Sequence, residues 1–259
     1  MDKPAFDAFA VDYDREFSFG CIGKLQRARV WRFLDRDLNP TKKLSILEIN
    51  CGTGIDALYL AKKGHSVLAT DISAEMIQVA KHQTHENLRF EVCSFQELST
   101  RFQEAQFDMV FSNFAGLNCV DTKELSSLNN SLSRLLKPGG KFIAVLLGKH
   151  CWMERLYFQF KGNSEAAKRR LSRSEALLNE QTTQSVWCYD TDELKEIFDA
   201  FQLKRSRPIG LFIPPSYFEK WISTRMILLK SLFGMEILCA NSSIGSNYAD
   251  HIYLSFQKR

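Results

Sequence analysis

The sequence predicts an α/β fold, a three-layer αβα sandwich around a mostly parallel seven-stranded sheet. Between residues 45 and 147, short apolar runs alternate five times with segments of helical periodicity, in units of about 20 to 35 residues. Such alternation is typical of parallel strands whose connecting helices cover both faces of a sheet. A strand is also expected near residues 202–207, and residues 251–257 alternate in strand fashion. These two complete the seven strands, and we expect the last strand to be antiparallel.

The elements of the first half have recognisable start and stop signals. Apolar runs of strand length predict strands at residues 45–49, 65–70, 88–92, 108–111 and 141–147. Helical spacing of apolar residues predicts helices over residues 25–38, 55–63, 74–80 and 125–135. Gly64 is placed to end the second of these helices, Ser73 to cap the third, and Pro138-Gly139-Gly140 to stop the fourth.

Beyond Gly148 the regular alternation ends. We expect an amphipathic helix over residues 152–178, a second helix over 191–201 and an aromatic-rich helix over 216–233. The chain shows no internal repeat and no low-complexity tract. We therefore interpret residues 1–259 as a single domain with helical insertions in its C-terminal half.

Composition and charge exclude several classes of protein. Apolar residues make up 45% of the 259 and charged residues 25%, which is typical of a globular chain. The formal net charge of +4 is too small to indicate a nucleic-acid or membrane partner. Acids stand where a signal peptide needs apolar residues, and the longest apolar runs fall far short of the roughly 18 residues of a membrane span. We expect a cytoplasmic protein without a membrane span.

The cysteines and histidines predict no metal site. Seven cysteines are scattered without a CxxC pair, and the five histidines show no HExxH or similar spacing. We expect the cysteines to be reduced, small side chains that are mostly buried.

The segment from Glu48 to Gly54, EINCGTG, carries the strongest functional signal. Its two closely spaced glycines let the backbone pass near a ligand at the carboxyl end of the first strand. The helix that follows presents free N–H groups there, and Asp71 ends the next strand, where an acid can accept both hydroxyls of a ribose. The pattern predicts a nucleoside-bearing cofactor.

Two cofactors are compatible with the glycine turn. Gly52-x-Gly54-x-x-Ala57 also satisfies the dinucleotide-binding pattern, so NAD is an alternative. Glu48 argues against it, because a carboxylate there would face a pyrophosphate of like charge. A carboxylate suits a ligand with an ammonium group, such as the methionine end of S-adenosyl-L-methionine.

With these residues the chain resembles the class I S-adenosylmethionine-dependent methyltransferases, in particular the small-molecule group called type 11 or type 25. The likeness covers about residues 6–147 and, more weakly, the final strand. Five segments carry it in order: LEINCGTG, ATDIS with Met76, CSFQEL, FDMVFSNFAGLNCV and LLKPGGKFI. The resemblance implies a Rossmann-like fold with an N-terminal helical lid (1–40), a cofactor-binding core (41–148) and substrate-side insertions (149–190 and 212–248).

The resemblance also implies which residues bind the cofactor. These positions are Tyr13, Arg27, Glu48, Asn50, Cys51, Gly52, Gly54, Asp71, Ile72, Met76, Ser94, Phe95 and Asn113. The glycine turn would hold the methionine part and Asp71 the ribose. Ile72 and Met76 would enclose the adenine, with Ser94 and Phe95 at its edge. Tyr13, with Phe9, would form the lid over the sulfonium, and Arg27 would meet the cofactor carboxylate.

Two positions depart from the family pattern. The first motif normally has glycine where Asn50 stands, so either the turn has a different shape or Asn50 hydrogen-bonds the ligand directly. The adenine motif normally carries an acid, where Ser94 offers only a hydroxyl. Ile72, Met76 and Phe95 have the alternative interpretation of ordinary core residues.

Methyl transfer from a sulfonium is an in-line displacement, and positioning of the two reactants can supply about 7–11 kcal/mol. A general base adds roughly 100- to 10,000-fold only if the acceptor must lose a proton. The candidates for this base are His150, just after the fifth strand, and Tyr189, and the neutral imidazole of His150 makes it the better one.

The predicted acceptor is a small organic molecule that is apolar or lipid-like. Ser112-Asn113-Phe114-Ala115 lacks the (D/N)PP(Y/F) and Pro-Cys sequences of nucleic-acid methyltransferases, and we interpret the basic cluster at residues 168–173 as a solvated helix face. Nine aromatic residues of the insertions are expected to wall an apolar pocket: Trp152, Tyr157, Phe158, Phe160, Trp187, Phe212, Tyr217, Phe218 and Trp221. An RNA or protein methyltransferase and a non-catalytic cofactor-binding protein remain the alternatives, and a homodimer stays open.

Overall fold

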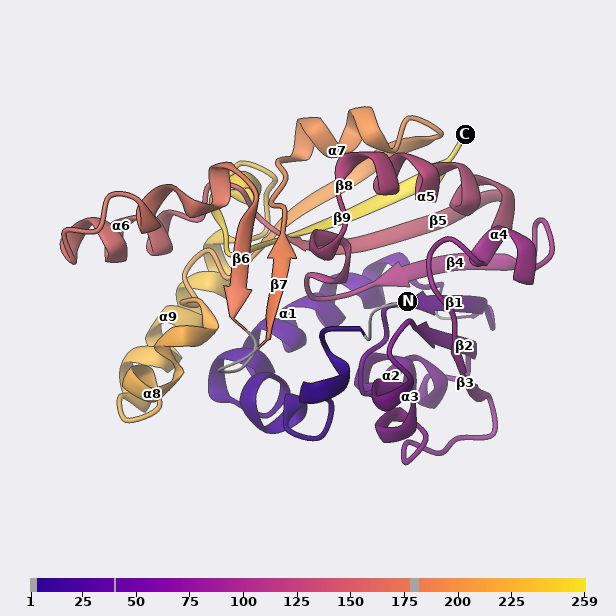
Figure 1. The fold of residues 1–259 in the computed structure, drawn as a ribbon, viewed down its shortest axis with the longest axis horizontal. Coiled ribbons are helices and arrows are strands. Elements are labelled where there is room, and N and C mark those ends of the chain that lie inside the picture. Colours follow the sequence, from indigo (N-terminus) through magenta and orange to yellow (C-terminus); the bar gives the residue numbers. More distant parts are fainter. Residues whose placement is uncertain (1–3, 40, 178–181) are drawn as a thin grey trace.

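The computed structural model describes residues 4–39, 41–177 and 182–259. Its main sheet has seven strands in the order β3-β2-β1-β4-β5-β9-β8 (Figure 1). The strands are β1 (Ser45–Ile49), β2 (Ser66–Asp71), β3 (Leu88–Val92), β4 (Phe107–Ser112), β5 (Leu136–Leu147), β8 (Phe201–Ile209) and β9 (His251–Lys258). β1 to β5 pair in parallel, and β9 is antiparallel to both of its neighbours. The predicted fold class is confirmed.

Helices cover both faces of this sheet (Figure 1). They are α1 (Cys21–Asp37), α2 (Ile55–Lys62), α3 (Ala74–Ala80), α4 (Leu98–Arg101), α5 (Thr122–Leu135), α6 (Trp152–Phe160), α7 (Thr191–Ile197), α8 (Glu219–Ile222) and α9 (Met226–Cys239). Short helical turns are η1 (Asp7–Phe9), η2 (Asp14–Ser18), η3 (Gly116–Cys119), η4 (Ala166–Leu171), η5 (Ser216–Phe218) and η6 (Ser246–Tyr248). The cap predicted at Ser73 is confirmed, because its hydroxyl accepts the Met76 N–H at 3.0 Å.

The alternation of side chains along each strand divides the core between the two faces. Leu47 and Val110 point to the cluster that contains α5 and α7, whereas Ile46 and Met109 join the cluster of α1, α2 and α3. The central strands are therefore apolar on both sides, as the unbroken apolar runs predicted. The sheet order reverses beside β1, so a crevice is expected outside the carboxyl ends of β1 and β4.

The helix predicted over residues 152–178 is wrong in its second half. α6 ends at Phe160, and Gly162 then takes a left-handed φ of 70° that terminates the helix. After η4, the segment β6 (Ser174–Leu177) pairs antiparallel with β7 (Thr183–Val186) in a separate two-stranded sheet. Residue 178, where we expected the helix to end, lies outside the described residues.

Other boundaries also differ from the prediction, and α1 and α5, for example, begin four and three residues earlier than expected. α7 ends at Ile197 rather than at residue 201, because Phe201 already pairs with Lys258 in the sheet. The helix expected over 216–233 is interrupted between α8 and α9. β5 continues through Pro138-Gly139-Gly140, where a register shift against β4 and a φ of 71° at Gly139 accommodate the glycines and proline.

Candidate functional site

The turn after β1 has three residues in the left-handed region. Asn50, Gly52 and Gly54 have φ values of 49°, 52° and 80°. At Gly54 a Cβ atom would lie 2.7 Å from the ring of Phe90, so both the backbone conformation and the space require glycine. The turn brings backbone N–H groups to the start of α2, as the sequence predicted.

Asp71, at the end of β2, holds this turn in place. Its two carboxylate oxygens accept the backbone N–H groups of Gly52 and Ser73, each at 2.9 Å. Burial raises the pKa of Asp71 although these hydrogen bonds oppose the shift. Since each carboxylate oxygen can accept a second hydrogen bond, Asp71 retains the capacity to bind two hydroxyls of a ligand.

Glu48 is a buried carboxylate with an unused oxygen. Its side chain is 1% exposed, and one carboxylate oxygen has no hydrogen-bond partner among the described residues. Burial raises the pKa of Glu48 well above its ordinary value, the charge of Asp56 adds to the rise, and Arg27 opposes it. Such an unpaired buried acid is costly for the fold and is characteristic of a ligand site.

Asp56, which the sequence reasoning missed, connects three elements at the site. It accepts hydrogen bonds from Trp31 Nε1 at 2.6 Å and from Asn113 Nδ2 at 2.8 Å, and it pairs with Arg27 at 3.3 Å. These partners belong to α1 and to the loop after β4. An acid in the first turn of a helix after the glycine motif was the available signal.

Arg27 and Asn113 therefore lie beside the glycine turn. The guanidinium of Arg27 sits 5.1 Å from the centre of the Phe114 ring. Phe114 and Ala115 have φ values of 47° and 66°, so the loop after β4 contains two consecutive strained residues. Strain of this kind persists where the surroundings define a functional loop.

Asn50 occupies the position where the family pattern has glycine. Its amide donates to the Asn113 carbonyl at 3.2 Å, and its side-chain oxygen accepts from the Ser112 hydroxyl at 2.7 Å. Asparagine tolerates the left-handed backbone conformation of this position. Asn50 thus adopts a left-handed conformation that glycine could also take, and its amide joins the β1 turn to the loop after β4. Gly116 is required for this contact, since a Cβ there would lie 2.2 Å from the Asn50 amide.

The N-terminal segment lies over the glycine turn. The Thr53 hydroxyl donates to Asp14 at 2.7 Å, and the Ser73 hydroxyl donates to Asp7. The ring of Tyr13 lies next to Gly52, because a Cβ atom added at Gly52 would be 4.0 Å from that ring. Burial raises the pKa of Tyr13 to about 12, so its hydroxyl is neutral at ordinary pH.

The residues expected around the adenine differ in exposure. Ile72 is 57% exposed, whereas Met76 is only 2% exposed and Phe95 packs against the core. The N–H and hydroxyl of Ser94 both donate to Glu97 at 2.8 Å. Ile72 is therefore the apolar side chain with free surface, and Glu97 brings an acid next to Ser94.

The two candidate bases have different surroundings. His150 lies in the turn after β5, half-buried, with its ring 6.4 Å from that of Tyr248. Tyr189 is 5% exposed and its hydroxyl donates to the Val120 carbonyl at 2.9 Å. Burial raises the pKa of Tyr189 to about 12, which makes it a poor proton acceptor near neutral pH.

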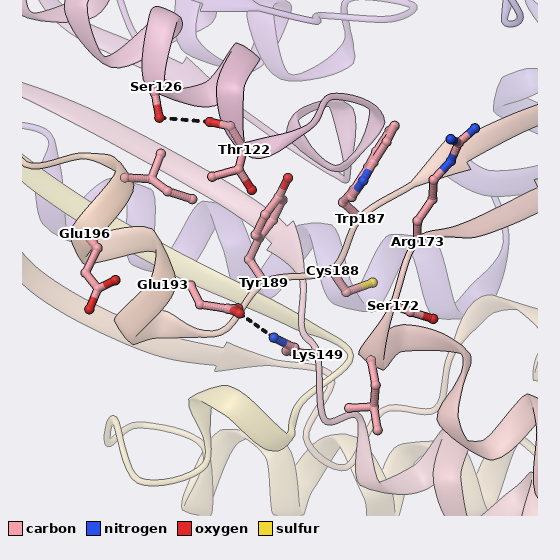
Figure 2. Close-up of a pocket in the computed structure, with 12 residues that line it drawn as sticks. Thr122, Ser126, Lys149, Ser172, Arg173, Trp187, Cys188, Tyr189, Glu193 and Glu196 are labelled. Atoms are coloured by element: carbon pink, nitrogen blue, oxygen red, sulfur yellow. Dashed lines mark hydrogen bonds and ion pairs between the residues drawn. The ribbon is translucent and has the colours of Figure 1, made fainter.

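A pocket of about 500 Å³ lies near the carboxyl end of β5 (Figure 2). Its wall includes Trp187 and Tyr189, and the ion pair between Lys149 and Glu193 crosses it. Of the nine aromatic residues expected around an apolar pocket, Trp187 lines this one. The nine aromatic residues therefore do not form a common wall around this pocket.

The other expected wall residues mostly pack on one another. Tyr157, on α6, lies 4.7 Å from Phe218 and 5.7 Å from Tyr217, measured between ring centres. Phe160 is 87% exposed. These aromatic side chains join α6 to η5 and α8, which periodicity along the sequence did not predict.

The basic cluster at residues 168–173 is not a solvated helix face. Arg169 and Arg170 both bind the carboxylate of Glu154, which is buried to 2%. Arg170 also binds Asp250 at 2.7 Å and the carbonyls of Gly148 and Asp250. The expectation was wrong for Arg169 and Arg170, because Glu154 in α6 and Asp250 just before β9 bind them, whereas Lys168 and Arg173 are exposed.

Comparison with known proteins agrees with this geometry. Residues 46–140, which contain the glycine turn, Asp71 and the loop after β4, match the family model described as a methyltransferase domain. A solved S-adenosylmethionine-dependent methyltransferase from Methanosarcina mazei superposes with a TM-score of 0.59 at 22% identity, over 87% of this chain and 96% of that one. Residues 46–140 thus match a methyltransferase domain, and the chain has the fold of such an enzyme. The predicted fold and family, and S-adenosyl-L-methionine as the cofactor of this family, are confirmed.

Curated relatives of the methyltransferase domain act on different acceptors. The tRNA 5-carboxymethoxyuridine methyltransferase of Escherichia coli is 28% identical over 58% of this chain and 59% of its own length. The demethylmenaquinone methyltransferase of Leptospira interrogans is 33% identical over 56% of this chain and 59% of its own length. The chain thus spans about three fifths of the length of these two relatives.

Proposed function

We propose that this methyltransferase domain transfers the methyl group of S-adenosyl-L-methionine to a small, apolar or lipid-like acceptor. The observation that carries the proposal is the unpaired carboxylate of Glu48, buried beside the glycine turn and Asp71. A buried anion without a partner favours a cationic ligand and disfavours a pyrophosphate.

In this proposal each residue of the site has a distinct role. Glu48 and the glycine turn bind the amino-acid end of the cofactor, and Asp71 accepts the ribose hydroxyls. Arg27, held by Asp56, supplies the positive charge for the cofactor carboxylate. Tyr13 and the N-terminal segment close over the sulfonium, and Ile72 covers the adenine. Because S-adenosyl-L-methionine carries an activated methyl group, the protein mainly aligns the acceptor for in-line attack.

An apolar acceptor is favoured over RNA by the state of the basic cluster. Arg169 and Arg170 are committed to Glu154 and Asp250, so only Lys168 and Arg173 of the cluster are both exposed and outside this network to contact phosphates. The relative that methylates tRNA makes RNA the second candidate. A gel shift with tRNA at low salt distinguishes the two, because an RNA enzyme must bind with an affinity that falls steeply as salt is added.

Calorimetry tests the cofactor. The protein is expected to bind S-adenosyl-L-methionine and its demethylated product S-adenosyl-L-homocysteine, and to give no heat with NAD under the same conditions. Binding of NAD in preference to S-adenosyl-L-methionine would overturn the proposal.

Glu48→Gln is expected to weaken cofactor binding by about ten- to a hundredfold, because a charge-assisted hydrogen bond is worth roughly 1.5–3 kcal/mol. The same variant should gain stability relative to the parent protein as pH rises above the unfolded pKa of Glu48. Burial raises the folded pKa of Glu48 above its unfolded value, so its contribution to stability is full below the unfolded pKa and is lost as pH rises through the folded pKa. Glutamine removes that loss.

Urea unfolding and calorimetry at a series of pH values measure the two effects of Glu48→Gln. The affinity of the parent protein should rise with pH relative to that of the variant, since titration of the ligand is common to both. A variant that loses both stability and affinity at every pH would show that Glu48 has a structural role instead.

His150→Ala should keep cofactor affinity and lower turnover by roughly 100-fold or more if the acceptor loses a proton to this imidazole. Measurement needs only release of S-adenosyl-L-homocysteine once an acceptor is found. Full turnover in a variant that still binds the cofactor would remove His150 from the mechanism.

A further inference from the structure

Large apolar side chains are exposed on the helices of the insertions. Among the described residues of the insertions, four apolar side chains are 80–87% exposed: Phe160 on α6, Ile227 and Leu238 on α9, and Ile244, which follows α9 in the sequence. Trp221 and Met226 are nearly half exposed. α6, α8 and α9 lie together at the end of the molecule that is away from β3 (Figure 1). We call the exposed apolar side chains of these three helices, Phe160, Trp221, Met226, Ile227 and Leu238, the apolar helical face. Clustered apolar exposure of this kind marks a surface that contacts another phase or molecule.

One side of α9 is already used by the fold. Leu229, Leu232 and Phe233 pack with Ile22 of α1, and the buried carboxylate of Glu236 accepts the N–H groups of Gly210 and Phe212 at 2.9 and 2.8 Å. The opposite side is apolar as well. Ile227 and Leu238 are about three turns apart, so they project in nearly the same direction. A helix that is anchored on one side and apolar on the other requires a partner for its free side.

The charges on this face are of one sign. Between residues 219 and 249 the acidic side chains are Glu219, which is half-buried and accepts the N–H groups of Cys21 and Ile22, and Glu236, which is fully buried; Lys220, Arg225 and Lys230 are exposed. On α6 the acid is Glu154, which is buried against Arg169 and Arg170. The exposed charged side chains on the segments that form the apolar helical face are therefore cations. Apolar side chains interleaved with cations are complementary to an anionic lipid surface.

A second copy of the chain fits this face less well. A two-fold interface places the same patch on both sides, so the cations of one copy would meet the cations of the other. Nor does any helix among the described residues have the length and apolar character needed to cross a membrane. Both observations favour helices that lie on a bilayer.

We propose that the protein binds the surface of an anionic lipid bilayer through the apolar helical face. Phe160, Ile227 and Leu238 enter the boundary between headgroups and acyl chains, while Lys220 and Lys230 contact the anionic headgroups. This binding goes beyond the proposed function, because it needs neither the cofactor nor the methyl acceptor, and its failure would leave methyl transfer untouched.

Vesicle flotation of the full chain without cofactor tests the proposal. The protein should float with vesicles of phosphatidylcholine in which phosphatidylglycerol replaces about a third of the lipid, and should bind far more weakly to phosphatidylcholine alone. Added salt should weaken the binding. Ile227→Ser combined with Leu238→Ser should lower the bound-to-free ratio by about tenfold or more, and Lys230→Glu by about tenfold.

Val92→Ser is the matched control, because Val92 is an exposed apolar residue (41%) on the edge strand β3, away from the apolar helical face. It should float like the parent protein. Phe160→Ser, on a separate helix, provides a second apolar variant if the double variant does not fold. Absence of flotation with anionic vesicles at low salt, or equal flotation of parent and double variant, would overturn the proposal. The proposal would also be overturned if light scattering showed that the parent protein is a dimer and the double variant a monomer, and neither bound vesicles.

Discussion

Asp71→Ala is expected to weaken the binding of S-adenosyl-L-methionine by about a hundredfold or more. Two charge-assisted hydrogen bonds to the ribose hydroxyls would be lost, each worth roughly 1.5–3 kcal/mol. The substitution also removes the acceptor for the Gly52 N–H, which holds the glycine turn at 2.9 Å. Calorimetry with S-adenosyl-L-methionine and with S-adenosyl-L-homocysteine should show the same loss, because both ligands carry the ribose.

Asp108→Ala separates this loss from a general effect on folding. Asp108 also accepts a backbone N–H from β1, that of Ser45 at 2.9 Å, but at the amino edge of the sheet. It should lower the unfolding free energy and leave cofactor affinity unchanged. Asp71→Asn, which keeps one acceptor oxygen and loses the charge, should fall between alanine and the parent protein. Equal affinity in Asp71→Ala and the parent would exclude a ribose contact.

Arg170→Met should lower the free energy of unfolding by about 3 kcal/mol or more. Its guanidinium lies between Glu154 and Asp250, and it also binds two backbone carbonyls. Removing it leaves buried acids with incomplete compensation, which typically costs several kcal/mol. The effect should appear in urea unfolding as a lower midpoint with an unchanged slope.

The pH dependence gives this prediction a second readout. Burial opposes ionisation of Asp250, but the charges of His251 and Arg170 prevail and hold its pKa well below its usual range. Burial is likewise outweighed at Glu154, where Arg169 and Arg170 lower the pKa. Both groups therefore contribute stability above their unfolded pKa, and that stability is lost as pH falls through their folded pKa. The difference in unfolding free energy between Arg170→Met and the parent protein should therefore become smaller below about pH 4.

Arg173→Met is the control for the same chemical change at the surface. Arg173 and its partner Glu175 have side chains that are 62% and 47% exposed. An exposed ion pair contributes at most about 1 kcal/mol, so this variant should unfold close to the parent protein. If both variants lost the same small amount of stability, the buried position of Arg170 would have no special importance.

The central strands and the glycine turn could be predicted from local sequence because their signals are local. β1 and β3 have the predicted bounds. β1 is a mostly apolar run covered on both faces, whereas the edge strand β3 alternates apolar and charged residues. Ser73 and Gly64 likewise act on their immediate neighbours. Elements with mixed signals, such as the segment after α6, were predicted less well because tertiary pairing decided between helix and strand.

The contacts that complete the site join residues far apart in the chain. Nothing near Asp56 in the sequence indicates that it binds Trp31 and Asn113, and nothing near Asn50 indicates its contact with Ser112. Arg170 likewise binds Asp250, which is eighty residues away in the sequence. Side-chain pairing of this kind follows from strand order and loop conformation rather than from spacing.

By itself the sequence determined the αβα sandwich, the left-handed glycine turn and the acid that ends β2, because backbone conformation and apolar periodicity are properties of short segments. Only the tertiary structure decided that Glu48 is buried with an unpaired oxygen, that the arginines after α6 are neutralised, and that α6, α8 and α9 leave apolar side chains exposed. The physical reason is that burial and charge compensation depend on which distant segments pack together.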